Sequence, residues 1–405
     1  MKTTGYLILG AGPSGLTYGR RLMDKGITDF IILEKEESAG GLCRSQEVDG
    51  KPLDIGGGHF LDVRRPKVCD FVFRFLPQDQ WNIFDRDSRI RVDGCEVSHP
   101  LEASIWQFPE KIQDRYLNSI KKAGCNTGAP MPTHFKDWIR WKLGDEIADN
   151  YMIPYNSKMF ADSLDELGTY WLEKLPNVSF EETLQSVKEH RSLGTQPGHA
   201  RFYYPKDYGY GEPFLRMADS MQHNIVYNAP VKELSLKDRT VTTMSGEKYQ
   251  AQKIITTIPW DSMMVTDASS EVKEAITKLK HSSVEIRYVN EDPGSKAHWI
   301  YVPSLEVPYH RILCRCNFCL GSRGYWVETV KSRAEAYKAS KWIKNFAYMN
   351  DYAYPLNTID KREAIALILK EAASFNVIGL GRWGEHEHYN SDVVIEKAME
   401  LADNE

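Results

Sequence analysis

The stretch Gly10-Ala11-Gly12-Pro13-Ser14-Gly15 decides the fold, because it joins a short apolar run to a helical pattern. In such a turn, Gly10 allows a tight bend, Gly12 lets the backbone approach a pyrophosphate, and Gly15 lets the helix pack closely on the sheet. The helix that starts near Ser14 turns its free N–H groups and its positive dipole end toward the phosphates. The motif therefore predicts a dinucleotide site.

The surroundings of this turn strengthen the prediction. Residues 5–9 are expected to form a buried strand, 14–24 a helix closed by Gly26, and Phe30 to Leu33 the next strand. Glu34 ends this second strand, with Lys35 beside it. An acidic residue at this place accepts hydrogen bonds from the adenosine ribose and disfavours a 2′-phosphate. Gly10, Gly12, Ser14, Gly15, Glu34 and Lys35 are accordingly the first candidate cofactor-binding residues.

Size and charge narrow the class of protein. A chain of 405 residues is too long for one simple core and predicts two or three structural units. The net charge of −5 offers no electrostatic reason to expect nucleic acid or an anionic membrane as partner. No apolar run approaches the roughly 18 residues of a membrane helix, and the first apolar run leads directly into the glycine turn. A cytoplasmic protein is therefore expected.

Cysteine usage agrees with a reducing compartment, because the seven cysteines are odd in number and scattered. Cys314, Cys316 and Cys319 follow His310 closely, which raises the question of a metal site. The alternating pattern of residues 310–316 is more typical of a strand with cysteines as small fillers. Since the paired C-x-x-C arrangement of zinc sites is missing, no metal is expected.

The organisation along the chain predicts an α/β fold with a discontinuous Rossmann-like domain. Helical patterns dominate residues 101–190, and alternating patterns with turns from Ser282 to Val330 indicate antiparallel strands. An α/β pattern returns at the C-terminus, with a strand from Asn376 to Gly379 and a helix from Val393 to Ala402. We therefore predict a cofactor domain (1–85, 200–265 and 365–405) with two insertions, a helical substrate domain (86–199) and an antiparallel-sheet substrate domain (266–364).

Two further glycine-rich segments favour FAD over NAD. Ala39-Gly40-Gly41-Leu42-Cys43-Arg44 and Asp54-Ile55-Gly56-Gly57-Gly58-His59 resemble the Gly-Gly loop and D-x-G-G-x-H element of the amine oxidase and protoporphyrinogen oxidase-like flavoproteins. Asn228-Ala229-Pro230-Val231 and the strand of residues 254–259 are similar to later strands of that group. The resemblance implies that Gly41, Leu42, Gly57, Gly58, His59 and the Val231 backbone contact FAD, with His59 near the flavin N5 atom.

The C-terminal segment resembles the part of these flavoproteins that faces the flavin pyrimidine ring. Gly381-Arg382 precedes Asn390-Ser391-Asp392 and the last predicted helix, and either Asn390 or Ser391 is expected to be its N-cap. A positive helix end near the ring stabilises the negative charge of reduced flavin. Gly381, Arg382, Asn390 and Ser391 complete the predicted cofactor set.

Taken in order, these segments make the chain similar to UDP-galactopyranose mutases over almost its whole length. The segments that carry the resemblance are residues 98–102, 154–160, 171–174, 298–303, 308–311 and 381–384. The resemblance implies a pyranose–furanose mutase in which N5 of reduced FAD attacks the anomeric carbon of a nucleotide-linked sugar. It further implies Arg311, Arg382 and His59 as catalytic residues. Asn156, Lys174, Tyr301, Arg311 and His388 would bind substrate.

The sequence departs from these mutases at two places and leaves other functions open. Lys174 stands where they carry a phosphate-binding arginine, and Leu101-Glu102 replaces the Phe-Gln that frames uracil, so the sugar and nucleotide stay unspecified. An oxidase or desaturase of an amine, porphyrin-like or terpenoid substrate is the alternative. A third hypothesis is a flavoprotein that acts as a binding module. NAD(P)H or another reductant, and a homodimer, are left open as partners.

Overall fold

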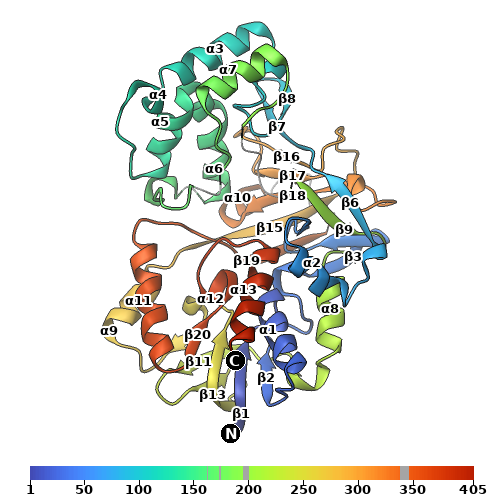
Figure 1. The fold of residues 1–405 in the computed structure, drawn as a ribbon, viewed down its shortest axis with the longest axis vertical. Helices are drawn as coiled ribbons and strands as arrows, with labels where there is room; N and C mark the ends of the chain where they lie inside the picture. Colours follow the sequence, from blue (N-terminus) through green and yellow to red (C-terminus); the bar gives the residue numbers. More distant parts are fainter. Residues whose placement is uncertain (162, 173–174, 195–199, 338–345) are drawn as a thin grey trace.

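The computed structural model describes residues 1–161, 163–172, 175–194, 200–337 and 346–405. Figure 1 shows three layers along the long axis of the molecule. An α/β unit with both chain termini lies at the bottom, a large sheet crosses the middle, and a group of helices lies at the top. The chain passes between the layers several times, so residues far apart in sequence meet where the layers join.

The bottom layer is built on an eight-stranded sheet of order β10-β2-β1-β13-β12-β11-β14, with β20 also paired to β13. The central strands are parallel, since β1 pairs in parallel with both β2 and β13, and β13 with β20. The strands are β1 (Lys2–Leu9), β2 (Phe30–Leu33), β10 (Ile225–Val226), β11 (Val231–Ser235), β12 (Thr240–Thr243), β13 (Lys248–Thr256), β14 (Met264–Val265) and β20 (Val377–Gly379).

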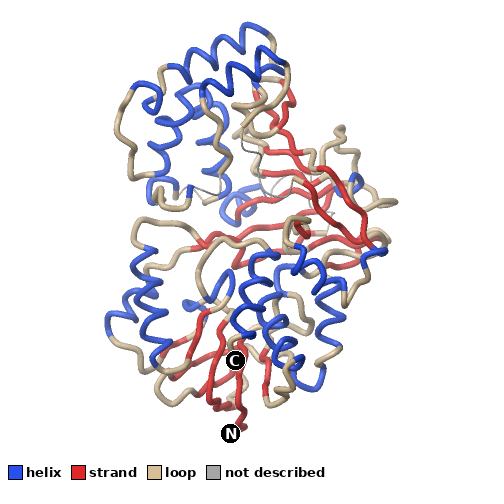
Figure 2. Tube along the Cα trace, in the orientation of Figure 1, coloured by secondary structure: helices blue, strands red, loops and turns tan. Residues whose placement is uncertain are grey.

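Helices cover both faces of this sheet (Figure 2), because alternate residues of its apolar strands point to opposite sides. Ile8 packs in one core with α1, α8 and α13, whereas Leu7 and Leu9 pack in another with α9 and α11. These helices are α1 (Pro13–Asp24), α8 (Glu212–Asp219), α9 (Ser270–Thr277), α11 (Lys361–Ser374) and α13 (Ser391–Asp403). The N-terminal α1 and the C-terminal α13 pack directly on each other.

The middle layer is a seven-stranded sheet of order β19-β15-β18-β17-β16-β7-β8, antiparallel except where β16 meets β7. Its strands are β7 (Ser88–Val92), β8 (Cys95–Ser98), β15 (His281–Val289), β16 (Trp299–Tyr301), β17 (Arg311–Leu313), β18 (Tyr325–Val330) and β19 (Ala347–Pro355). Two small sheets flank it, formed by β3 (Ser45–Val48), β4 (Lys51–Asp54), β5 (Leu61–Asp62), β6 (Trp81–Asp85) and β9 (Arg201–Pro205).

The top layer has its own apolar core, which includes Phe135, Ile139 and Tyr116. Its helices are α3 (Glu110–Lys121), α4 (Gly124–Thr127), α5 (Phe135–Ile147), α6 (Ile153–Met159) and α7 (Phe180–Glu189). The remaining helices are α2 (Pro66–Phe73), α10 (Lys331–Tyr337) and α12 (Gly381–Gly384). None of the helices in the described residues is long and apolar enough to cross a membrane.

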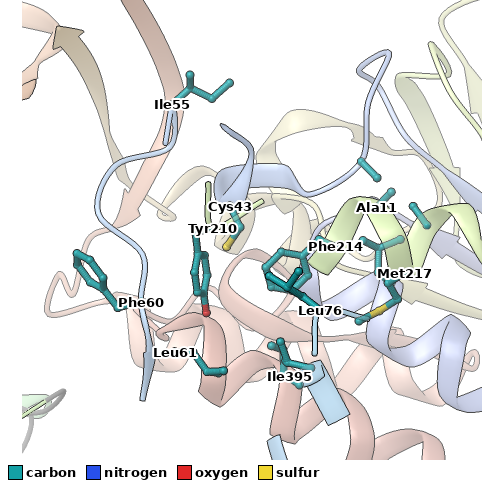
Figure 3. Close-up of a cluster of buried hydrophobic side chains, with 14 of the residues drawn as sticks. Ala11, Cys43, Ile55, Phe60, Leu61, Leu76, Tyr210, Phe214, Met217 and Ile395 are labelled. Carbon is teal, nitrogen blue, oxygen red and sulfur yellow. The ribbon is translucent and has the colours of Figure 1, made fainter. Parts of the chain in front are cut away.

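A buried cluster joins the glycine-rich segments to the C-terminal helix. Figure 3 shows Tyr210 and Phe214 between Cys43 of the Gly-Gly loop and Ile395 of α13. The rings of Tyr210 and Phe214 lie 5.8 Å apart at a steep angle, a favourable edge-to-face arrangement. This packing holds separate cofactor segments in one place.

The predicted α/β class is confirmed, and the N-terminal unit and the C-terminal strand and helix lie within a few residues of their predicted bounds. The strand predicted over residues 310–316 is wrong in length, since β17 ends at Leu313 and a 3₁₀ turn starts at Arg315. The predicted domain bounds stay a prediction. Strands β7 and β8 precede the helices, yet they extend the middle sheet through β16, a long-range pairing invisible in local patterns.

Candidate active site

The first glycine turn has the geometry of a dinucleotide cradle. Gly10 has a φ of 102°, which favours glycine, and a Cβ on Gly15 would lie 2.0 Å from the carbonyl oxygen of Gly10. The Glu34 carboxylate accepts a 2.7 Å hydrogen bond from the Ala11 N–H and is nearly buried. Burial raises the pKa of Glu34. The turn therefore brings this carboxylate directly beside the glycine loop, where a ribose contact was predicted.

The other predicted adenosine-side segments gather around this turn. A Cβ on Gly41 would lie 3.1 Å from the Gly12 Cα, so the two glycine loops touch through their backbones. The segment that leads into Val231 lies beside Glu34, since the Ala229 N–H donates to the Glu34 carbonyl. Lys35 points outward and forms an exposed ion pair with Glu36. The described residues thus fit a flat cofactor that lies against bare backbone.

Two alanine substitutions separate cofactor contact from folding. A Cβ on Gly12, whose φ is −77°, meets only ordinary contact at 3.8 Å, so Gly12→Ala should fold with stability near that of the wild type. Because the added methyl group intrudes where the pyrophosphate approaches, FAD affinity should fall by roughly 5- to 150-fold, the range for about 1–3 kcal/mol of overpacking. Gly15→Ala should impair folding as well, because its methyl group meets backbone. Flavin titration and thermal unfolding measure both effects, and wild-type FAD affinity in Gly12→Ala would contradict the cradle.

The D-x-G-G-x-H element forms a loop whose first residue, Asp54, is anchored by hydrogen bonds. The buried Asp54 carboxylate accepts hydrogen bonds from the Tyr204 hydroxyl and the Tyr210 N–H, and burial raises its pKa to about 6. His59 donates from Nδ1 to the Gly57 carbonyl at 3.1 Å, and its ring stacks on Tyr210. Burial, together with the nearby Arg382 charge, lowers the pKa of His59 to about 3. The ring is therefore neutral, with its proton on Nδ1 and a free electron pair on Nε2.

A cavity of about 180 Å³ opens where the three layers meet. It is lined by residues from the glycine loop, the middle sheet, α6 and the start of α13. The polar and charged lining residues are His59, Arg86, Tyr301, Arg311, Glu328, Tyr354, Arg382, His388, Asn390 and Ser391. Three guanidinium groups thus face one cavity, and Glu328 is the one carboxylate among the described lining residues.

The part-buried Arg311 and the fully buried Glu328 form an ion pair across β17 and β18. Oε2 of Glu328 accepts from Nε of Arg311 at 2.7 Å and lies 2.6 Å from Nη2, which also donates to the Tyr354 hydroxyl at 3.2 Å. Burial opposes both charges, but their attraction outweighs it, so the pKa of Arg311 is raised and that of Glu328 lowered to about 2. Arg311 was predicted as a substrate ligand, whereas its carboxylate partner was not predicted.

The Arg382 guanidinium donates to backbone carbonyls, and no carboxylate of the described residues forms an ion pair with it. Its Nε and Nη2 donate to the Tyr389 carbonyl at 3.0 and 2.7 Å, and Nη1 donates to the Ala353 carbonyl at 3.1 Å. Burial lowers the pKa of Arg382, and Arg311 nearby adds to this effect. A part-buried guanidinium that has no carboxylate partner in the part of the chain that the structure describes favours an anionic ligand.

Arg86 and Tyr301 form the wall of the cavity on the side of β7 and β16. Nη2 of Arg86 donates to the Tyr301 hydroxyl at 3.2 Å, and its guanidinium lies over the Trp299 ring at 4.8 Å. The Trp299 ring N–H also donates to the Tyr301 hydroxyl, at 3.1 Å. The hydroxyl oxygen thus accepts two hydrogen bonds. Its own proton points away from both donors and can be donated to a ligand in the cavity.

The start of α13 lies at the cavity, where Asn390 and Ser391 are part of the lining. Asn390 occupies the N-cap position, but its side chain makes no capping bond, and the buried Ser391 hydroxyl is hydrogen-bonded to Tyr210 at 2.8 Å. Gly381 has a φ of 76° and lies against Ser14, since a Cβ there would meet the Ser14 Oγ at 2.1 Å. The two ends of the chain therefore share one site.

The other predicted substrate residues have separate outcomes. His388 lines the cavity, and its ring lies 4.9 Å from that of Tyr354. Asn156 lies in α6 and donates to the carbonyl of Met152, the residue just before this helix, while Met159 of α6 lines the cavity. Lys174 lies outside the described residues. The roles given to these side chains stay predictions.

Sequence reasoning missed Arg86, Glu328 and Tyr354. A signal existed for Glu328, because a charged residue inside the apolar run Tyr325-Trp326-Val327-Glu328 needs a partner once buried. Arg86 stands between two aspartates in an ordinary polar stretch and carries no comparable signal. Among the described residues, no group of three histidine, cysteine or acidic side chains is placed to hold a metal ion.

Comparison with known proteins places this chain in a family. Residues 13–285 match the flavin containing amine oxidoreductases. The chain belongs to this family. Among curated proteins, polyamine oxidase 7 of Oryza sativa subsp. japonica is 44% identical over 62 residues, 15% of this chain and 13% of the relative. Coproporphyrinogen III oxidase of Mycobacterium tuberculosis is 24% identical over 174 residues, 41% of this chain and 37% of the relative.

The matched segments therefore span well under two thirds of these two relatives. A solved structure of reduced UDP-galactopyranose mutase superposes over 100% of this chain and 94% of its own, with a TM-score of 0.87 and 23% identity. The chain thus has the fold of a mutase-like flavoprotein within the flavin containing amine oxidoreductases. Family membership and the glycine cradle together assign FAD as its cofactor.

Proposed function

We propose that the protein is a flavin-dependent mutase that interconverts the pyranose and furanose forms of a nucleoside diphosphate sugar. The observation that carries the proposal is the charge of the cavity. Arg86, Arg311 and Arg382 line the cavity together with a single carboxylate, Glu328, among the described lining residues. Within the described part of the chain, Arg382 has only carbonyl oxygens as hydrogen-bond partners. Such a site matches a diphosphate, whose oxygens accept paired hydrogen bonds from guanidinium groups.

The same charge argues against an amine as substrate. Amines are cationic near neutral pH, and the excess of guanidinium groups would repel them. The first turn of α13 adds a further positive end at the cavity, through Asn390 and Ser391. A likeness of fold alone leaves the reaction open, and these charges are what favour the mutase over an oxidase.

Each of the described side chains has a task in this reaction. When bound in its reduced form, FAD supplies a nucleophilic nitrogen for the anomeric carbon of the sugar. Arg382 and Arg311 bind the diphosphate and stabilise the charge it gains as its bond to the sugar breaks. Tyr301, directly across from Arg311 on the neighbouring strand β16, donates a further hydrogen bond to the diphosphate. Neutral His59, oriented by the Gly57 carbonyl, presents Nε2 as an acceptor beside the cofactor loop.

The test is conversion of nucleotide sugars with the flavin oxidised or reduced by dithionite. We expect a product of unchanged mass and a new retention time only with reduced flavin, and no net reductant consumed per turnover. A panel of uridine, guanosine and deoxythymidine diphosphate sugars identifies the nucleotide. Protein with oxidised flavin is the matched control. Stoichiometric hydrogen peroxide from an amine or a porphyrinogen, without sugar conversion, would establish the oxidase alternative.

A further inference from the structure

Glu328 occupies the junction between the cofactor loop and the substrate arginine. Its side chain is fully buried, and its strand position lies directly opposite Arg311. One oxygen, Oε2, contacts Arg311, while the other, Oε1, accepts from the Gly58 N–H at 3.3 Å. Oε1 would also lie 2.9 Å from a Cβ on Gly57, so this loop passes tightly over the carboxylate. One side chain therefore touches both halves of the site.

This contact occupies only part of the Arg311 fork. Nε and Nη2 face Glu328, and Nη2 also donates to Tyr354, whereas Nη1 has no hydrogen-bond partner among the described residues. The arginine thus presents one remaining edge to the cavity it lines. Its positive charge is at the same time largely balanced, because the Glu328 carboxylate is ionised and buried with it.

We propose that Glu328 is a positioning residue that limits how tightly Arg311 holds the diphosphate and fixes this arginine relative to the Gly57–Gly58 loop. The proposal rests on the mutase function. In an isomerisation the diphosphate must detach from the sugar and then re-form its bond. Binding that is equally strong in every state lowers KM without accelerating the reaction. A carboxylate that shares the arginine keeps the anion within reach and prevents it from being trapped.

The decisive variant is Glu328→Gln, which keeps the shape of the side chain and removes its charge. In the FAD-loaded protein, uridine diphosphate should bind at least about tenfold more tightly, because Arg311 is no longer neutralised. Both kcat and KM should fall together. The flavin midpoint potential should rise, because a negative charge beside the cofactor loop has been removed and reduced flavin is anionic. A merely structural role predicts weaker binding of both nucleotide and FAD.

Two further variants keep the test interpretable. Glu285→Gln removes another buried carboxylate of the same sheet. Glu285 pairs with Arg287 at a distance of 2.7 Å, and neither residue belongs to the described cavity lining, so the substitution should leave nucleotide affinity unchanged. Glu328→Asp keeps the charge and should keep the wild-type affinity, which supplies a folded comparison if Glu328→Gln is unstable. In that case loss of affinity in Glu328→Asp overturns the proposal.

The outcomes also separate this proposal from the mutase function. If wild type binds uridine diphosphate and folded Glu328→Gln binds it equally or more weakly, the role of Glu328 is wrong while the mutase stands. If wild type binds none of the nucleoside diphosphates and no inorganic pyrophosphate, both are overturned. Calorimetry at fixed salt, with flavin fluorescence as the second signal, gives the affinities.

Discussion

Replacing Arg311 with methionine is expected to destabilise the protein by about 3–5 kcal/mol, the cost of leaving one partner of a buried ion pair alone. The cost arises because Glu328 is fully buried and its carboxylate has Arg311 as its closest cationic partner, at 2.6 Å. Methionine keeps much of the volume and leaves Glu328 without a permanent cation, with only the His310 ring, whose Nε2 lies 3.4 Å away, beside Oε2 among the described charged groups. The midpoint of urea unfolding, measured on the FAD-loaded protein, reports the change.

The double variant Arg311→Met with Glu328→Gln is the matched control, because it removes both charges. Its free energy of unfolding should be close to that of the wild type, because the two residues interact directly and their effects are not additive. It should nevertheless turn over nucleotide sugar more slowly than wild type, by on the order of 10²–10³ if Arg311 stabilises the departing diphosphate. A single variant as stable as wild type would show that the pair is not formed as described.

Replacing Arg382 with methionine is expected to weaken nucleoside diphosphate binding by roughly 10- to 100-fold, as for the loss of a hydrogen bond to a charged group. The rate should fall further, on the order of 10²–10³, because the charge that develops on the leaving diphosphate loses a fixed cation. Arg382→Lys should recover only part of both, since an ammonium cannot span the Tyr389 and Ala353 carbonyls as the planar fork does.

Arg216→Met serves as the control for Arg382, because Arg216 is a partly exposed arginine on α8 paired with Glu212 at 2.7 Å. The substitution is chemically identical and should leave binding and rate unchanged. FAD content, measured by absorbance after denaturation, should stay near wild type in both variants. Unchanged nucleotide affinity in folded Arg382→Met would remove the main support for an anionic substrate and favour the oxidase.

The family and the proposed reaction rest on different kinds of observation. The glycine cradle and the matched residues 13–285 place the chain among flavin containing amine oxidoreductases, whose shared fold accommodates several chemistries. The mutase proposal depends instead on the guanidinium groups around one cavity. Experiments on Arg311, Glu328 and Arg382 therefore test the reaction without testing the cofactor.

The sequence by itself determined the cofactor-binding framework. The turn at Gly10–Gly15, the acidic Glu34 and the strand-to-helix order were readable because each depends on neighbours within one short segment. The same holds for the C-terminal helix that begins at Ser391. A backbone with positive φ, as at Gly10 and Gly381, strongly favours glycine. The glycine pattern therefore indicates the local structure directly.

Only the tertiary structure decided the electrostatics of the cavity. Arg86, Arg311, Glu328 and Arg382 come from segments far apart in the chain, and their meeting depends on the pairing of β7 with β16 and of β17 with β18. Periodicity describes which face of one element is apolar, but it does not say which element lies opposite. The sequence therefore did not show that Glu328 pairs with Arg311, because the effect of a buried charge depends on which group neutralises it.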